Sequence, residues 1–282
     1  MTYKEAIEIG ERRLQEAGIA DAKNDAWLLL AMVCRIDHTY YYMHMAEELP
    51  EEIVAEFEAV LKKRAERIPL QYITGEQDFM GLSFHVDDSV LIPRQDTETL
   101  VEQALKLATP GMKVMDMCTG SGCVLISVLK HAKGLEGYGY DISKKALNVA
   151  KENARRNEVS AEFERSNLFE DVRERDFDMI LSNPPYIPTD VIATLMPEVA
   201  SYEPFTALDG HEDGLYFYRE IAKKSRDFLK PEGFLLLEIG NDQASAVTEI
   251  LEKNGFSRIQ VVQDLARNDR VIVARKRGYE HV

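Results

Sequence analysis

Apolar positions recur every three or four residues over the first part of the chain. Residues 22–33 and 53–61 each place their large apolar side chains on one face of a helix. At the start, Thr2 is followed three residues later by Glu5, which is the spacing of a helix capping box. The pattern predicts that residues 1–75 form a bundle of short amphipathic helices, and no side chain in it indicates catalytic chemistry.

An aromatic cluster interrupts this pattern at residues 40–45, which read Tyr-Tyr-Tyr-Met-His-Met. Such side chains can belong to the core of a small bundle, or they can form a surface that binds a partner protein. We expect the core and keep the surface as the alternative.

The pattern changes after residue 75, where short stretches of β-branched and aromatic residues begin. The segments 84–86 and 90–92 flank the turn-forming residues at 87–89. We therefore expect a β-hairpin within residues 76–92, which links the helical domain to the rest of the chain.

Strands and helices alternate over residues 93–282, which predicts one α/β domain with a parallel sheet covered on both faces. The expected strands are 113–117, 137–142, 161–165, 177–182, 234–239, 257–262 and 270–274. The expected helices are 98–107, one ending at 129, 143–157, 215–229 and 243–253, with a turn at 230–233. About seven residues separate the last two strands, too few for a crossover helix, so this pair is predicted to be antiparallel.

Composition and charge narrow the class of protein. The chain has 282 residues, of which 45% are apolar, and its 49 acidic and 34 basic residues give a net charge of −15. A protein that grips nucleic acid usually carries a basic face, so we expect no direct nucleic-acid partner. No apolar run approaches the roughly 20 residues that span a bilayer, and the first residues show no leader pattern. We therefore expect a cytoplasmic protein without membrane contact.

The cysteines and histidines predict no metal site. Cys34, Cys118 and Cys123 form no CxxC pair, and the six histidines are scattered without a zinc motif. The odd number of cysteines also fits a reducing compartment.

A glycine-rich segment follows the first strand of the α/β region, where residues 116–122 read Asp-Met-Cys-Thr-Gly-Ser-Gly. Gly120 and Gly122 allow the backbone to approach a ligand closely. Asp141 ends the next strand, where a carboxylate can bind both hydroxyls of a ribose, and ligands of such sheets lie at these strand ends. The third glycine of the dinucleotide motif is missing, which favours an adenosyl group without phosphates over a dinucleotide.

A second segment, Asn-Pro-Pro-Tyr at residues 183–186, leaves the end of the strand 177–182. The two prolines fix the φ angles of the turn. The side-chain oxygen of Asn183 and the carbonyl of Pro184 can each accept a hydrogen bond, and together they can hold both hydrogens of a planar NH2 group. Tyr186 offers a ring face against which such a flat group can lie.

This arrangement suits methyl transfer to an amide nitrogen. An amide nitrogen is a poor nucleophile because its lone pair is delocalised into the carbonyl. Acceptors on both of its hydrogens raise the electron density at nitrogen and aim it at an activated methyl group about 3 Å away. S-adenosylmethionine carries such a methyl group and leaves S-adenosylhomocysteine as product, and no strong general base is needed before transfer.

Several segments together resemble the release-factor glutamine N5-methyltransferases, a family of class I S-adenosylmethionine-dependent methyltransferases. The resemblance covers nearly the whole chain, with motifs at 69–75, 90–98, 116–122, 182–188, 203–214, 238–240 and 269–271. The motif at 183–186 is shared with adenine and guanine methyltransferases, whereas the segment 92–98 is much more specific.

The resemblance implies a Rossmann-like class I sheet of seven strands. A small helical domain precedes it in the chain and helps to hold the substrate protein. The resemblance also implies methylation of the glutamine in the Gly-Gly-Gln motif of class 1 peptide chain release factors. The implied cofactor contacts are Cys118, Thr119, Gly120, Ser121, Gly122, Asp141, Asn167, Leu168 and Asn183. The implied contacts of the substrate glutamine are Asn183, Pro184, Pro185 and Tyr186. Of these, the implied catalytic residues are Asn183, Pro184 and Tyr186.

The sequence departs from the family pattern at three places. Cys118 and His211 stand where glycine is common in the family, and the segment 265–270 lacks a glycine often found there. These departures concern the geometry of three loops and leave the chemistry unchanged.

Three charged residues lie at the start of the helix 98–107: Arg94, Asp96 and Glu98. They can contact substrate, or they can brace the helix, and the sequence does not choose between these roles. Asp96 or Thr97 is also a candidate cap of that helix.

Two other functions compete with protein methylation. A nucleic-acid adenine or guanine N-methyltransferase shares the motif at 183–186, which would stack on a flipped base. The net charge of −15 argues against that function. A non-catalytic protein that keeps only the cofactor pocket is the third possibility, and the intact motif argues against it.

Overall fold

The computed structural model describes residues 1–278, so the last four residues of the predicted domain 93–282 lie outside the described part. The chain divides into two compact units. The first, here called the helical unit, comprises Met1–Glu76 together with Met196–Tyr202. The second, here called the sheet unit, comprises Gln77–Leu195 and the chain from Glu203 onward.

Amphipathic helices build the helical unit, as their spacing predicts. They are α1 (Tyr3–Glu16), α2 (Ala22–Cys34), α3 (His38–His44), α4 (Glu51–Ala65) and α5 (Leu70–Thr74). Thr2 caps α1 through the expected capping box with Glu5. Fully buried leucines of α1, α2 and α4 pack around Phe57 to form the core of this unit.

The aromatic cluster lies mainly on the surface of the helical unit. Helix α3 has no buried residue, and Tyr42 and Met43 are 68% and 74% exposed. The expectation that residues 40–45 form core is therefore wrong for these side chains. Stacking explains how α3 keeps its order while exposed, because Tyr40 stacks on His44 and Trp27 on His38, each with ring centroids 4.0 Å apart.

A short segment distant in sequence completes the helical unit. Helix α10 (Pro197–Ala200) brings Glu198 to Arg64, whose guanidinium is buried between Asp25 and Glu198 at 2.7 and 3.0 Å. Arg67 binds the other oxygen of Glu198 at 2.6 Å. Paired carboxylates compensate the burial of the arginine charge. The sequence pattern gave no sign of this excursion, because ion pairs between distant segments leave no periodicity.

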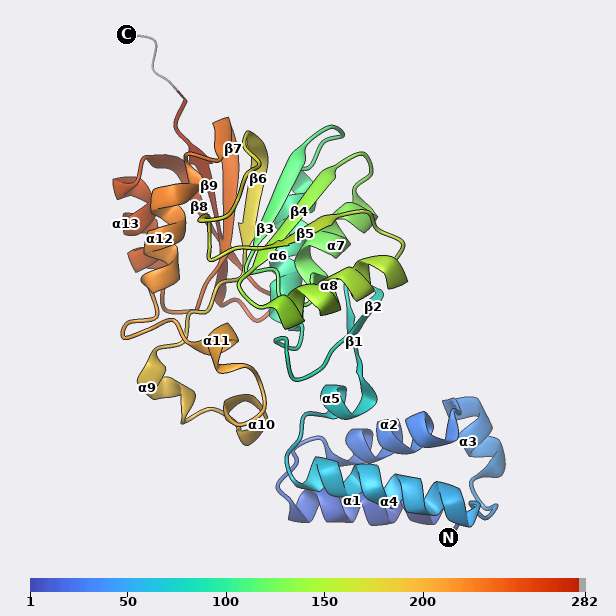
Figure 1. The fold of residues 1–282 in the computed structure, drawn as a ribbon. Coiled ribbons are helices and arrows are strands. Elements are labelled where there is room, and N and C mark those ends of the chain that lie inside the picture. The colour runs from blue at the N-terminus through green and yellow to red at the C-terminus, as the bar shows by residue number, and fades with distance from the viewer. Residues whose placement is uncertain (279–282) are drawn as a thin grey trace. The chain divides into compact units, whose positions relative to one another are not determined.

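A seven-stranded sheet forms the centre of the sheet unit, as predicted (Figure 1). Its strands are β3 (Lys113–Met117), β4 (Glu136–Asp141), β5 (Glu162–Arg165), β6 (Phe177–Ser182), β7 (Leu229–Glu238), β8 (Phe256–Gln263) and β9 (Asp269–Lys276). Their order is β5-β4-β3-β6-β7-β9-β8. The first five in this order are parallel, and β9 is antiparallel to both β7 and β8.

Helices cover both faces of this sheet (Figure 1). One face packs against α6 (Glu98–Leu107), α7 (Cys123–His131) and α8 (Lys144–Arg156), and the other against α12 (Tyr216–Ser225) and α13 (Ala244–Lys253). Successive residues of a central strand, such as Met179 and Ile180 of β6, therefore enter different core clusters. The remaining short helices of the sheet unit are η1 (Gln95–Thr97), α9 (Thr189–Ile192) and α11 (Phe205–Leu208).

The hairpin differs from the predicted one. Its strands are β1 (Glu76–Phe79) and β2 (Leu82–His85), and the segment 90–92 is not a strand. Met80 and Gly81 form the turn with φ angles of 52° and 72°, the left-handed values that a two-residue hairpin loop requires. Methionine is not a usual residue for such a turn, so the sequence pointed instead to 87–89. There Asp87 closes a local turn by accepting from the backbone of Ser89.

The predicted turn at residues 230–233 lies inside β7. The pairing of β6 with β7 is irregular there, and Glu232 has a φ angle of 62°. A local bulge thus absorbs the proline and glycine without ending the strand. Among residues 1–278, no helix is both long and apolar enough to cross a bilayer.

Candidate functional site

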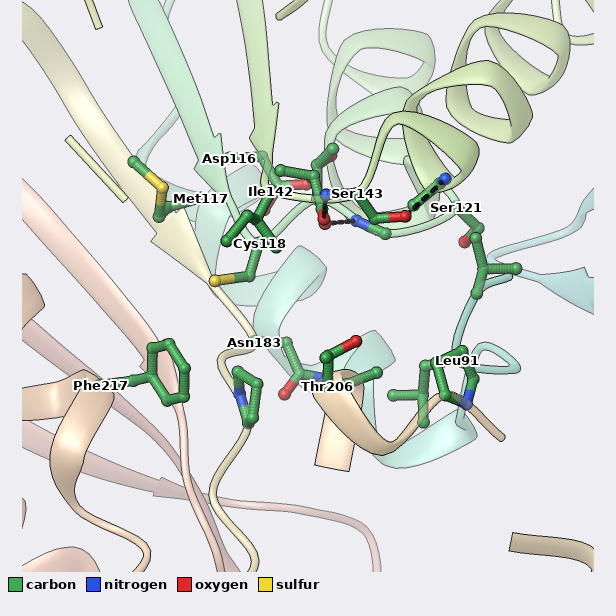
Figure 2. A pocket seen from close by; sticks show the side chains of 18 of the residues that line it. Leu91, Asp116, Met117, Cys118, Ser121, Ile142, Ser143, Asn183, Thr206 and Phe217 are labelled. Atoms are coloured by element: carbon green, nitrogen blue, oxygen red, sulfur yellow. Dashed lines mark hydrogen bonds between the residues drawn. The ribbon is translucent and has the colours of Figure 1, made fainter. Parts of the chain in front are cut away.

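The order of the strands reverses between β3 and β6. The chain first adds β4 and β5 on one side of β3, and then adds β6 on its other side. At such a switch point the loops beyond the carboxyl ends of the strands diverge and leave a crevice. The loops after β3, β4, β5 and β6 all border one cavity there, of about 380 Å³. Figure 2 shows Asp116, Cys118, Ser121, Ile142 and Ser143 on one side of it and Asn183, Thr206 and Phe217 on the other.

The structure places most of the predicted site residues on this cavity. The predicted residues that line it are Cys118, Thr119, Gly120, Ser121, Asp141, Asn167, Leu168, Asn183 and Pro185. The predicted residues outside the lining are Gly122, Pro184 and Tyr186. The loops that follow four parallel strands therefore bring together residues from 118 to 185, as the topology of the sheet requires.

The loop after β3 is held by hydrogen bonds to two carboxylates. The hydroxyl of Thr119 donates to Asp116 over 2.6 Å, and the backbone N–H of Gly120 donates to Asp141 over 2.9 Å. Burial raises the pKa of Asp116 to about 7, although the Thr119 hydroxyl opposes this effect. These contacts fix the backbone of the loop around the edge of the cavity.

Gly122 serves packing in this loop. Its φ angle is 79°, and a Cβ atom there would lie 2.9 Å from Ile126 and 3.1 Å from Ala150. A side chain would therefore push apart helices α7 and α8, so the glycine fixes the start of α7 close to its neighbour.

Asp141 is oriented for ligand binding by two backbone donors. Gly120 donates to one carboxylate oxygen and Ser143 to the other, each over 2.9 Å. Burial raises the pKa of Asp141, while these backbone hydrogen bonds lower it. Each oxygen keeps a further lone pair that can accept from a hydroxyl group.

The Asn-Pro-Pro-Tyr corner presents two different faces. Asn183 borders the cavity, and its side-chain NH2 group donates to the Thr97 hydroxyl over 3.3 Å. Tyr186 points away into the core, with its hydroxyl 3.4 Å from Glu238, and burial raises its pKa. Tyr186 thus supports the corner from behind in this structure, whereas we had expected its ring face on the cavity.

The backbone of Tyr186 is clamped by residues that the sequence reasoning did not identify. The side chain of Gln243 donates to the Tyr186 carbonyl over 3.0 Å. A Cβ atom at Gly210 or Gly214 would lie within 2.8 Å of the Tyr186 backbone. Only glycine allows this close approach, which explains the two glycines of the segment 203–214.

Aromatic side chains form part of the cavity wall opposite the loop after β3. Phe205 is 54% exposed, and the ring centroids of His211 and Tyr216 lie 4.3 Å apart. Phe217 also lines the cavity (Figure 2). None of them was predicted as a site residue, because Phe205 and His211 come from the irregular region after β6, while Tyr216 and Phe217 begin the helix α12, where no motif points to a site.

The three charged residues at the start of α6 have structural partners. Both carboxylate oxygens of Glu203 lie 2.7 Å from Arg94. Asp96 lies 3.3 Å from Arg270, and Glu98 accepts from the backbone of Met80 over 2.7 Å. Asp96 and Glu98 therefore brace this region, while Arg94 both pairs with Glu203 and lines the cavity.

The three departures from the family pattern share one backbone feature. Cys118, His211 and Arg267 have φ angles of 63°, 65° and 67°. This left-handed region suits glycine and costs other residues on the order of 1–2 kcal/mol. The loops therefore keep the glycine-like conformation without the glycine.

Replacing Arg267 by glycine is expected to raise the free energy of unfolding by about 1 kcal/mol, because the left-handed conformation loses its steric cost. Arg267 is exposed, so little packing is lost. Chemical denaturation measures the change, and Arg267→Ala, which keeps the steric cost, is the matched control. Equal stabilities of the glycine and alanine variants would contradict this explanation of the departures.

Comparison with known proteins agrees with this architecture. The PrmC N-terminal domain family matches residues 5–75, and the methyltransferase small domain family matches residues 95–198. A methyltransferase of Pyrococcus furiosus has the same fold, with a TM-score of 0.52 at 18% identity over 71% of this chain and 90% of that chain.

Two relatives match over the full length. The release factor glutamine methyltransferase of Clostridium acetobutylicum is 40% identical over 99% of this chain and all of its own. That of Cereibacter sphaeroides is 43% identical over 98% of this chain and 99% of its own. The chain, with a cavity at the switch point of a methyltransferase sheet, therefore belongs to the family of release factor glutamine methyltransferases.

Proposed function

We propose that this methyltransferase transfers a methyl group from S-adenosylmethionine to the side-chain amide nitrogen of the glutamine in the Gly-Gly-Gln motif of class 1 release factors. The observation that carries the proposal is the placement of Asn183 on the same cavity as Asp141 and the loop after β3. An amide acceptor and a nucleoside-binding carboxylate thus face one space.

The charges around the cavity fit a cofactor without phosphates. Its lining includes the carboxylates of Asp116, Asp141 and Asp209. Its one arginine, Arg94, is already paired with Glu203. A pyrophosphate would meet net negative charge here, whereas a positively charged sulfonium is attracted. S-adenosylmethionine supplies, when bound, a methyl group on such a sulfur.

The residues of the chain take three roles in this proposal. Asp141 accepts hydrogen bonds from the ribose hydroxyls, and Cys118–Gly122 with Asn167 and Leu168 enclose the rest of the cofactor. The oxygens of Asn183 and Pro184 accept from the two hydrogens of the glutamine amide and hold its nitrogen toward the methyl group. Transfer breaks the methyl–sulfur bond and leaves a neutral thioether, and the methylated nitrogen returns to neutrality by releasing one of these two protons to water.

The helical unit is proposed to dock the release factor. Helix α3 offers exposed aromatic and methionine side chains, among them Tyr42 and Met43. Such residues are enriched in protein interfaces relative to the rest of the surface.

Transfer of a labelled methyl group tests the proposal. We expect label from methyl-labelled S-adenosylmethionine in a class 1 release factor and none in a variant whose Gly-Gly-Gln glutamine is replaced. Duplex DNA and transfer RNA are offered at equal concentration in parallel reactions. Efficient labelling of either nucleic acid, with an unlabelled release factor, would instead favour the base methyltransferase.

A further inference from the structure

Asn183 can serve as an acceptor only if its side chain presents the oxygen to the cavity. The two ends of a carboxamide have nearly the same shape, and a half-turn of the side chain would present the NH2 group instead. That orientation would place donors against the donors of a substrate amide. Some other group must therefore fix the orientation of Asn183.

The first contact behind Asn183 is the hydroxyl of Thr97. It accepts from the Asn183 NH2 group over 3.3 Å, and Thr97 is 2% exposed. Thr97 stands at the cap position of α6, yet its side chain makes no capping hydrogen bond. Its hydroxyl is thus directed to Asn183, and its own proton remains to be donated.

The candidate acceptor for that proton is Glu238 at the end of β7. Glu238 is 2% exposed, and the Thr97 hydroxyl lowers the pKa of its carboxyl. Within residues 1–278, the buried Oε2 atom of Glu238 has no hydrogen-bond partner, Thr97 included, so it is an unsatisfied acceptor that can take the Thr97 proton. An ionised carboxylate can only accept a hydrogen bond. Thr97 must therefore donate to Glu238, and its oxygen accepts from the NH2 group of Asn183.

We propose that Thr97 and Glu238 are positioning residues for the transfer, forming a buried relay that holds the Asn183 amide with its oxygen toward the cavity. The proposal rests on the proposed function of Asn183. The carboxylate of Glu238 accepts from Thr97, which in turn accepts from the NH2 group of Asn183. One hydrogen of the Asn183 NH2 group is then held by Thr97, which fixes the amide plane with its oxygen toward the cavity.

The surroundings of Glu238 make the relay sensitive to pH. Tyr186 and Tyr218 approach it from the corner and from α12, Arg270 from β9 and Asp96 from η1. Burial raises the pKa of Glu238 to about 7, while Thr97 and Arg270 oppose this shift. When Glu238 is protonated it can donate to Thr97, whose proton then turns to Asn183 and favours the reversed amide. Activity should therefore be lost as the pH falls through about 7.

Variants of Thr97 separate this role from simple packing. Thr97→Val removes the hydroxyl but keeps the shape, and it is expected to lower kcat about tenfold, whereas Thr97→Ser, which keeps the hydroxyl, restores most of it. Ser127→Ala, which removes a buried hydroxyl without a partner on α7, is the matched control and should leave kcat unchanged. Thermal unfolding of each variant reports its folding.

The pH profile of kcat, at saturating cofactor and release factor, completes the test. The wild-type enzyme should show an acidic limb near pH 7, and Glu238→Gln should lower kcat and remove that limb. Asp116 has a similar pKa, so Asp116→Asn is measured in parallel, and the acidic limb should persist in that variant. If folded Thr97→Val is as active as the wild type, or the limb survives in Glu238→Gln, the relay is refuted. A wild-type enzyme that labels no release factor would refute the proposed function instead.

Discussion

Alanine in place of Asn183 is expected to lower kcat for glutamine methylation on the order of 10²- to 10³-fold. The variant removes the oxygen that holds one hydrogen of the substrate amide, so the nitrogen is no longer aimed at the methyl group. It also removes the donor to Thr97. Steady-state kinetics with methyl-labelled cofactor measure the loss.

The control for this variant is cofactor binding measured by calorimetry. Asn183 is one of many residues on the cavity, so the Kd for S-adenosylmethionine should change far less than kcat. Asn183→Asp is a useful companion, because it keeps the shape but has no NH2 group for Thr97. Full activity of the alanine variant would contradict the role of Asn183.

Alanine in place of Asp141 is expected to weaken cofactor binding on the order of 10²- to 10⁴-fold. Hydrogen bonds to a charged group contribute about 1.5–3 kcal/mol each, and two ribose hydroxyls lose their acceptor. The loop after β3 also loses the acceptor for the N–H of Gly120. Calorimetric titration with S-adenosylmethionine and with S-adenosylhomocysteine measures the effect.

Glu164→Ala provides the matched control for Asp141. Glu164 is an exposed carboxylate on the neighbouring strand β5 and does not line the cavity. Removing it changes the net charge equally but should leave the Kd within about twofold, since exposed charges are well screened. Equal affinities of the Asp141 and Glu164 variants would exclude Asp141 from the binding site.

The centre of the sheet could be predicted from sequence because its central strands, such as β3 and β6, are buried on both faces. The apolar runs at 113–117 and 177–182 match β3 and β6 at both ends. The hairpin could not be predicted, because its turn uses Met80 in a left-handed conformation that methionine rarely adopts. The placement of α10 in the helical unit could not be predicted either, because only spatial contacts, such as that of Glu198 with Arg64, connect it to that unit.

Some residues of the candidate site could likewise be predicted from sequence, and others could not. Residues at strand ends, such as Asp141 and Asn183, could be found because parallel topology determines where these ends meet. The residues behind them could not. Thr97 looked like a helix cap, and Glu238 was noted only as part of the family motif at 238–240, whereas the structure places Thr97 directly behind Asn183. Contacts of this kind depend on side-chain distances, which sequence spacing does not encode.

A crystal structure with S-adenosylhomocysteine and a release factor that retains its Gly-Gly-Gln glutamine tests the central claim most directly. The quantities to measure are the distances from the glutamine side-chain nitrogen to the Asn183 side-chain oxygen and to the Pro184 carbonyl oxygen. We expect both distances to be about 3 Å, with the nitrogen facing the cofactor sulfur. A glutamine bound elsewhere, or an Asn183 amide that presents its NH2 group to the cavity, would contradict it.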